Sequence, residues 1–176
     1  MTLTATATRG AVLRPLTQVD RATIEAFSRA IPLFRPEEVE VALEVLDASF
    51  KPGQMDYITM GAELDGRLVG WICWGPTPCT VGTYDMYWVA VDPSVQGAGV
   101  GSLLVAEMER RLAGEARLIV VETGGRREYG PTRAFYMKRG YRIAARVPDF
   151  YAPGDDQVIF VKTPADPRAE ESAKRR

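Results

Sequence analysis

Residues 89–101 of the chain read VAVDPSVQGAGVG, an apolar run that ends in a glycine-rich segment. A helix is expected over residues 99–113, because Leu104, Met108 and Leu112 recur at helical spacing after the glycines. Alternate glycines let the backbone turn sharply and bring successive N–H groups towards one point. At a helix N-terminus, that point attracts phosphate oxygens. The glycine spacing alone leaves a tight strand-to-helix turn without a ligand equally open.

Two nucleotide-binding motifs fit this segment poorly. A P-loop needs Lys and then Ser or Thr after its last glycine, whereas Gly101 is followed by Ser102 and Leu103. A dinucleotide-binding fingerprint needs a third glycine three residues after its second. This chain has Ser102 at that position when Gly97 and Gly99 are the first two glycines, and Leu104 when Gly99 and Gly101 are. Glu122 does lie about twenty residues further on, where the fingerprint places an acid that binds ribose. A nucleotide-dependent oxidoreductase therefore stays as an alternative.

Outward from this segment, strands alternate with inserted helices. Strands are expected over residues 11–16, 57–64, 68–74, 83–91, 117–122, 141–147 and 157–162. Further helices are expected from Asp20 onward and over residues 36–50 and 131–138. This order predicts an α/β or α+β sheet packed against helices. We expect a loose arm over residues 1–10, a single domain over residues 11–163 and a mobile tail over residues 164–176.

The composition excludes several kinds of chemistry. The chain has no histidine, which rules out Ser-His-Asp and Cys-His triads, His-ligated metals and an imidazole base. Carboxylates, tyrosine, backbone amides or a cofactor must then carry any catalysis. The two cysteines, Cys73 and Cys79, are too few for a zinc site, so no metal is expected. A buried thiol and a loop thiol are favoured over a disulfide between them.

Charge and hydropathy indicate the partners and the compartment. The net charge is −1, so no basic field favours nucleic acid or an anionic membrane surface. No apolar run approaches the ~18 residues of a membrane span. The first residues, MTLTAT, lack the basic and apolar regions of a secretory signal. The sequence therefore predicts a cytoplasmic protein that binds neither nucleic acid nor membrane.

Two linked motifs carry a resemblance to a known family. Residues 89–101, with the pattern VAVDP followed by Gln96-x-x-Gly99-x-Gly101, resemble the acyl-CoA-binding motif of the GNAT N-acetyltransferase superfamily. Residues 129–141, Tyr129-x-x-Thr132-x-x-Phe135-Tyr136-x-x-x-Gly140-Tyr141, are similar to the later family signature, which usually reads Asn-x-x-Ala-x-x-Leu/Phe-Tyr-x-x-x-Gly-Phe. The resemblance implies a mixed, mostly antiparallel central sheet of six to seven strands. It also implies flanking helices and a splayed parallel strand pair.

The resemblance implies that acetyl-CoA is the co-substrate. In this family the pantetheine arm lies between two parallel strands, here residues 83–91 and 117–122, and pairs with backbone groups such as those of Val89 and Val91. The N–H groups after the strand hold the pyrophosphate. Tyr129 stands where the family commonly has an Asn that contacts the cofactor. The implied cofactor-binding residues are Val89, Ala90, Val91, Gln96, Gly97, Ala98, Gly99, Val100, Gly101, Ser102, Tyr129, Thr132 and Tyr136.

The implied reaction needs a proton acceptor and a proton donor, because an alkylamine with a pKa of ~10.4 is mostly charged at neutral pH. Tyr136 matches the family tyrosine that protonates the leaving thiolate, although a core residue beside Phe135 is the alternative. The base is expected to be Asp85 or Glu122, acting through water. A surface or ion-paired role is the alternative for Asp85, and a helix cap or an ion pair for Glu122.

The sequence thus predicts an acetyl-CoA-dependent N-acetyltransferase that acts by direct transfer. A primary amine of a small molecule is the favoured acceptor, and a homodimer is left open. The alternatives are the oxidoreductase and a non-catalytic acyl-CoA-binding sensor module. Residues 31–34 and 149–156 are expected to determine which acceptor binds, because aromatic residues next to acids suit a cationic amine. Ordinary turn chemistry is the alternative explanation for residues 149–156.

Overall fold

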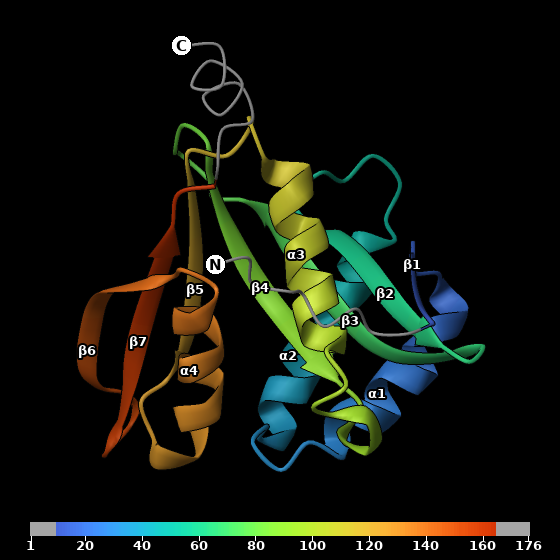
Figure 1. The fold of residues 1–176 in the computed structure, drawn as a ribbon, viewed down its shortest axis with the longest axis horizontal. Coiled ribbons are helices and arrows are strands. Elements are labelled where there is room, and N and C mark those ends of the chain that lie inside the picture. The colour runs from blue at the N-terminus through green and yellow to red at the C-terminus, as the bar shows by residue number, and fades with distance from the viewer. Residues whose placement is uncertain (1–9, 165–176) are drawn as a thin grey trace, which may run out of the picture. The chain divides into compact units, whose positions relative to one another are not determined.

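The computed structural model describes residues 10–164 (Figure 1). Their contacts group them into two compact units: the first holds residues 10–74 and 88–108, and the second holds residues 75–87 and 109–164. The single domain predicted over residues 11–163 stays a prediction. The expected arm and tail lie outside the described residues, apart from residues 10 and 164.

The helices and strands follow the predicted order. The first unit contains β1 (Ala11–Arg14), η1 (Gln18–Asp20), α1 (Arg21–Arg29), α2 (Pro36–Ser49), β2 (Ile58–Leu64) and η2 (Pro93–Val95). The second contains β5 (Leu118–Gly124), η3 (Arg127–Tyr129), α4 (Gly130–Lys138), β6 (Arg142–Ala152) and β7 (Asp155–Lys162). Three elements have residues in both units: β3 (Arg67–Pro76), β4 (Thr83–Val91) and α3 (Val100–Leu112).

Seven strands form one sheet in the order β1-β2-β3-β4-β5-β7-β6. The pairs β1–β2, β2–β3, β5–β7 and β6–β7 are antiparallel. β4 and β5 are parallel, and their register runs from Thr83 opposite Leu118 to Met86 opposite Val121. The predicted mixed, mostly antiparallel sheet with one parallel pair and flanking helices is confirmed, while the splay of that pair stays a prediction.

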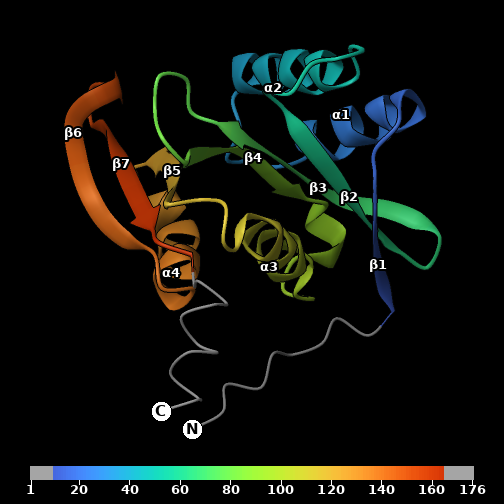
Figure 2. The same ribbon diagram turned by 90° about the horizontal axis from the view of Figure 1, so that it is seen from above.

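In the first unit, helices cover both faces of the strands, with α1 and α2 on one side and α3 on the other (Figure 2). The apolar stripes of these helices are buried, as Leu43, Leu46 and Leu104 show. A Cβ on Gly70 of β3 would lie 3.0 Å from Val100 Cγ1 and 3.1 Å from the Ala90 carbonyl oxygen. Glycine at this position therefore allows α3 to pack closely against β3.

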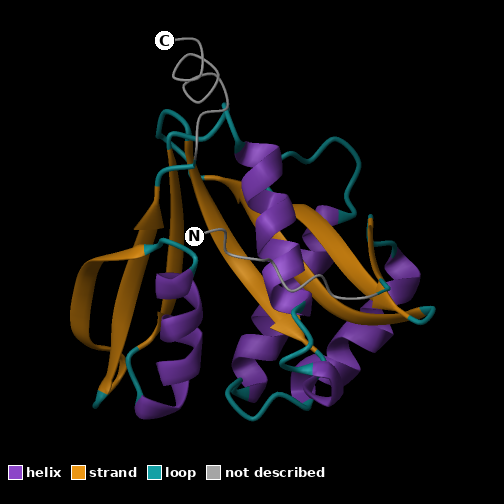
Figure 3. Cartoon of the chain, viewed as in Figure 1, coloured by secondary structure: helices purple, strands orange, loops and turns teal. Residues whose placement is uncertain are grey.

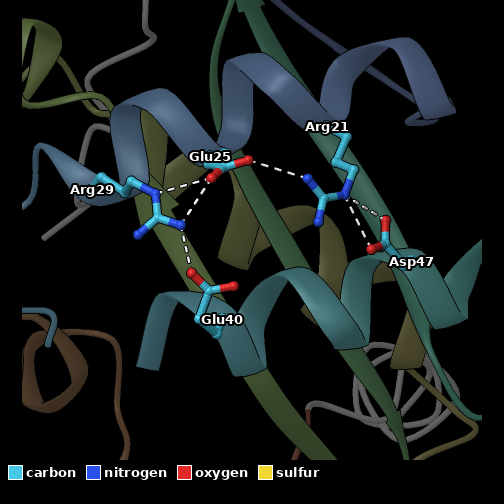
Figure 4. Close-up of polar contacts among 5 residues, drawn as sticks. All are labelled: Arg21, Glu25, Arg29, Glu40 and Asp47. Carbon is cyan, nitrogen blue, oxygen red and sulfur yellow. Dashed lines mark hydrogen bonds and ion pairs between the residues drawn. The ribbon is translucent and has the colours of Figure 1, made fainter. Parts of the chain in front are cut away.

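A chain of ion pairs holds α1 to α2 in the first unit (Figure 4). Within α1, Glu25 pairs with both Arg21 and Arg29. Arg21 also reaches Asp47 of α2 at 2.9 Å, and Arg29 reaches Glu40 of α2. Solvent-exposed pairs such as these stabilise a fold little, so the chain of pairs orients the two helices more than it stabilises them.

The turn between β1 and α1 depends on Asp20. The Asp20 carboxylate accepts hydrogen bonds from the Arg14 guanidinium at 2.8 and 2.9 Å and from the Thr17 backbone N–H at 2.8 Å. The side chain is only 7% exposed. The hydrogen bond from Arg14 is the main reason that the pKa of Asp20 falls from 3.8 to about 2.

We expect the Asp20 carboxylate to make the fold acid-sensitive. Because its pKa is lower in the folded chain, the stabilisation is present above pH 4 and is lost as the pH falls towards 2. The shift corresponds to about 2 kcal/mol at neutral pH. Asp20→Asn should therefore lower the free energy of unfolding at pH 7 but barely change it near pH 2. Denaturant unfolding at both pH values checks this, and an equal loss at both contradicts it.

In the second unit, α4 packs on the antiparallel strands β5 and β7. Its Tyr136 ring lies 5.6 Å from the Phe160 ring of β7 and 5.6 Å from the Tyr141 ring. Tyr136, Phe160 and Tyr141 are all buried. These aromatic rings form the centre of the second unit and fix the orientation of α4 on β7.

β6 differs from its prediction, because it runs from Arg142 to Ala152 through Pro148 rather than ending near residue 147 (Figure 3). It is the last strand in the sheet order and its first nine residues are exposed. Proline has no N–H to donate, and an edge strand tolerates it because the outer side needs no partner. The longer strand is therefore a consequence of its edge position, which local sequence does not reveal.

The cysteines are free, as favoured from the sequence. Cys73 is buried in the first unit, where burial raises the pKa of its thiol to about 12. Cys79 is exposed in the second unit. The buried thiol is thus inert at neutral pH.

Candidate active site

The glycine-rich loop of the first unit is held at its start by Asp92. The Asp92 backbone N–H donates to the Val69 carbonyl oxygen at 2.8 Å, which ties the end of β4 to β3. The Asp92 carboxylate accepts from the Ser94 N–H at 2.8 Å and from the Arg67 guanidinium at 2.7 Å. These contacts form the short η2 turn and fix where the loop begins.

The loop then presents backbone N–H groups at the start of α3. Gly97 and Gly99 have φ values of 83° and 87°, in the left-handed region that favours glycine. The first hydrogen bond of the helical turn runs from the Leu103 N–H to the Gly99 carbonyl oxygen at 3.0 Å. The N–H groups of Val100, Gly101 and Ser102 precede that bond and belong to the donors that a helix start leaves without helical partners. Donors of this kind are the ones that anion-binding helix starts present, and the anion site itself stays a prediction.

Exposure along the loop supports the same interpretation. Gln96, Gly97, Ala98 and Ser102 are exposed, and Gly99 and Gly101 are partly exposed. Val100 is 1% exposed and packs towards Gly70. The apolar side chain of Val100 thus anchors the loop, while most of the residues beside it stay exposed or partly exposed.

The last residues of β4 in the first unit alternate as a half-buried strand should. Ala90 is buried, whereas Val89 and Val91 are partly exposed. Trp88 packs against Phe34 of the α1–α2 loop, with ring centroids 5.3 Å apart. Val89 and Val91 therefore share one face of the strand, as predicted from its period of two.

The two predicted bases have different surroundings in the second unit. Asp85 is partly exposed on β4, opposite Val120, and its Oδ2 accepts a hydrogen bond from the Thr77 hydroxyl at 2.7 Å. Glu122 is exposed on β5, and its Oε2 accepts from the Gln157 side-chain amide at 2.6 Å. Neither contact is an ion pair, so each carboxylate keeps an oxygen that can accept a proton.

Tyr136 lies inside the second unit. It is 3% exposed, and its ring also contacts the Phe135 ring at a centroid distance of 5.3 Å. Burial raises the pKa of its hydroxyl well above the ordinary value. The phenol is therefore protonated at neutral pH, as a proton donor has to be.

Comparison with known proteins decides the family. Residues 56–143, half of the chain, match the model of the "Acetyltransferase (GNAT) domain". The chain belongs to the GNAT acetyltransferase family. The match spans the glycine-rich loop, both predicted bases and Tyr136.

Individual GNAT proteins extend this likeness. The chain is 39% identical over 102 residues to blasticidin-S acetyltransferase of Streptomyces morookaense. The match covers 57% of this chain and 66% of that relative, so this chain spans just under two thirds of the relative's length. A GNAT-family protein of known structure from Desulfovibrio desulfuricans has a TM-score of 0.83 and 36% identity, and covers 89% of this chain and 100% of its own. An aminoglycoside 6'-N-acetyltransferase complexed with coenzyme A has a TM-score of 0.70 at 19% identity, over 86% of this chain and 96% of its own. At that identity the likeness shows the fold alone.

The loop just before the second GNAT signature is held by hydrogen bonds that the sequence did not predict. Arg133 of α4 donates to the carbonyl oxygens of Gly124 and Arg126 at 2.7 and 2.8 Å. Tyr129 is buried, and a Cβ on Gly124 would lie 2.9 Å from its ring. Arg126 lies over that ring and pairs with Asp155 at 3.0 Å. Tyr129 thus packs against the end of β5, whereas Thr132 is partly exposed on α4.

Two acids of the β6–β7 hairpin, Asp149 and Asp156, form their contacts within the hairpin, whereas Asp155 pairs with Arg126 outside it. Asp149 accepts from the Gly154 N–H at 2.6 Å, and Asp156 accepts from the Asp149 N–H at 2.9 Å and pairs with Arg146. These contacts fit the turn chemistry that the sequence left open for residues 149–156. In the described residues, no group of three or more metal-ligating side chains occurs. Over the same residues, no helix is long and apolar enough to span a membrane.

Proposed function

We propose that the chain is an acetyl-CoA-dependent N-acetyltransferase that moves an acetyl group directly from CoA to a primary amine. The observation that carries this proposal is the open glycine-rich loop at the start of α3, in a chain of the GNAT family. Family membership gives no support to the oxidoreductase alternative.

The residues of the loop fit the cofactor. The loop offers backbone N–H groups and the Ser102 hydroxyl at the start of α3, and such donors suit the oxygens of a pyrophosphate. We assign the pyrophosphate to residues 96–102 and the pantetheine amides to the backbone of Val89 and Val91. Bound there, acetyl-CoA supplies a thioester carbon that an amine can attack.

The amine must first lose a proton. A carboxylate of the second unit, Asp85 or Glu122, accepts that proton through a water molecule. Both carboxylates have one oxygen held by a neutral donor, which orients the group without neutralising its charge. The amine nitrogen is then free to form the new C–N bond.

The carbon–sulfur bond of the thioester then breaks, and two groups of the protein assist this step. A backbone N–H near Val91 stabilises the negative charge that develops on the thioester oxygen. Tyr136 gives its hydroxyl proton to the leaving sulfur and takes up the second proton of the attacking nitrogen, which the amide product no longer carries. Burial of the phenol keeps it protonated until the thiolate forms.

A small-molecule amine is the proposed acceptor. Blasticidin-S acetyltransferase, the 39%-identical relative, is named for a small molecule and supports this class. A cytoplasmic location and a homodimer stay predictions.

A panel of acceptors tests the proposal. Thiol release from acetyl-CoA is measured with blasticidin S, an aminoglycoside, a free amino acid and a peptide with an N-terminal alanine. We expect at least one small molecule to give a kcat/KM that is ten or more times that of the peptide. A peptide preference contradicts the acceptor class. Tight CoA binding without turnover on any amine instead identifies the non-catalytic sensor.

A further inference from the structure

The segment that joins β3 to β4 is pinned at several points within the second unit. The Thr77 N–H donates to the Thr83 carbonyl oxygen at 2.9 Å, and the Thr80 hydroxyl donates to the Thr77 carbonyl oxygen at 2.7 Å. The N–H groups of Arg117 and Leu118 both donate to the Gly82 carbonyl oxygen, at 2.7 and 3.1 Å. The backbone of Thr77 is therefore fixed relative to β4 and the start of β5.

The fixed backbone places the Thr77 side chain next to Asp85, one of the two predicted bases. The Thr77 hydroxyl donates to Oδ2 of Asp85 at 2.7 Å across eight residues of sequence. Both residues are partly exposed. A carboxylate bonded at one oxygen has its rotamer restricted, and its second oxygen keeps a defined direction for a water molecule.

Glu122 is held less firmly on its own side of the contact. Its partner Gln157 is buried, but Glu122 is exposed, whereas Asp85 is only partly exposed, and it has one more rotatable bond than an aspartate. A base that works through water needs a fixed carboxylate, because a misplacement of 1 Å can reduce a rate about 100-fold.

We propose that Thr77 is a positioning residue that holds Asp85 as the base of the reaction. This inference rests on the proposed function and decides between its two carboxylates. Thr77 touches neither substrate nor cofactor in this account, and acts only through the carboxylate of Asp85.

Variants at Thr77 separate positioning from packing. Thr77→Val keeps the shape of the side chain but removes the donor, and should lower kcat about 10-fold. Thr77→Ser keeps the donor and loses a methyl group, and should stay within about threefold of the wild type. Val81→Ala, which shortens an 85% exposed side chain of the same segment and leaves the contacts of Thr77 in place, is the control and should stay within about twofold.

Four further measurements complete the test. Calorimetric binding of CoA and the melting temperature should be alike for the wild type and Thr77→Val. Asp85→Ala should lose about 100-fold in kcat, and adding Thr77→Val to it should cause no further loss, because the hydroxyl acts only through Asp85.

The outcomes are distinct. A Thr77→Val variant with wild-type kcat, or a Thr77→Ser variant as slow as Thr77→Val, overturns the positioning role. An Asp85→Ala variant with wild-type kcat overturns the choice of base but leaves acetyl transfer intact. A wild-type chain without turnover on any amine overturns the proposed function itself.

Discussion

Replacing Tyr136 by phenylalanine is expected to lower kcat about 100-fold, the lower end of what a positioned acid or base contributes. In the proposed mechanism the hydroxyl protonates the departing thiolate, which otherwise leaves as a charged group. The ring packs against Phe135, Tyr141 and Phe160, and phenylalanine preserves those contacts. Affinity for CoA should therefore stay within about twofold, as measured by calorimetry, since the lost group contributes only to the chemical step.

Tyr141→Phe is the matched control for this result. Tyr141 belongs to the same buried cluster, and its substitution removes the same hydroxyl from a neighbouring ring. Its kcat should stay close to the wild-type value. Equal kcat for Tyr136→Phe and the wild type removes Tyr136 from the donor role. An equal loss in both variants shows instead that the cluster as a whole was disturbed.

The second large effect is expected at the glycine-rich loop. The double substitution of Gly97 and Gly99 by alanine should weaken CoA binding about 30-fold. Both residues have positive φ, where an L-residue is disfavoured by roughly 1–2 kcal/mol. The loop relieves that strain by changing conformation, so its N–H groups no longer point at the pyrophosphate. About 2 kcal/mol of lost binding corresponds to the stated factor.

Two other glycines of the first unit provide the control. Gly53 and Gly66 have φ values of 76° and 77°, and a Cβ on either meets no atom within 4 Å. Their double substitution by alanine introduces similar strain away from the loop. We expect a similar loss of thermal stability in both double variants and a loss of CoA affinity in the loop variant alone. Unchanged affinity in the loop variant would remove the loop from the cofactor site.

The sequence predicted the helices and strands whose formation depends on the pattern of neighbouring residues. The strand over residues 83–91 and the helix over residues 36–50 match β4 and α2 to within a residue. Alternating or helical apolar periodicity sets these elements, and Pro36 and Lys51-Pro52-Gly53 mark the ends of α2. Features that depend on tertiary position were missed, as the continuation of β6 through Pro148 shows.

The candidate site likewise contains residues that the sequence predicted and contacts that it did not. The glycine-rich loop and Tyr136 are visible as motifs, because their residue types and spacing carry the chemistry. Thr77 is not visible, since Gly75-Pro76-Thr77-Pro78 reads only as a chain break. Its contact with Asp85 exists because the β3–β4 connection folds back onto β4, which the seven intervening residues do not indicate. The support that Arg133 gives to Gly124 and Arg126 is hidden for the same reason.

Direct transfer is tested most directly by following an isotopically labelled acetyl group. The protein is mixed with labelled acetyl-CoA and its best acceptor, and the label is counted in the amine, in free acetate and on the protein. Our account predicts one labelled amide for each thiol released, no label on the protein and none in acetate beyond the uncatalysed background. Label that accumulates on the protein before it reaches the amine, or thiol release without a labelled amide, would contradict direct acetyl transfer to an amine.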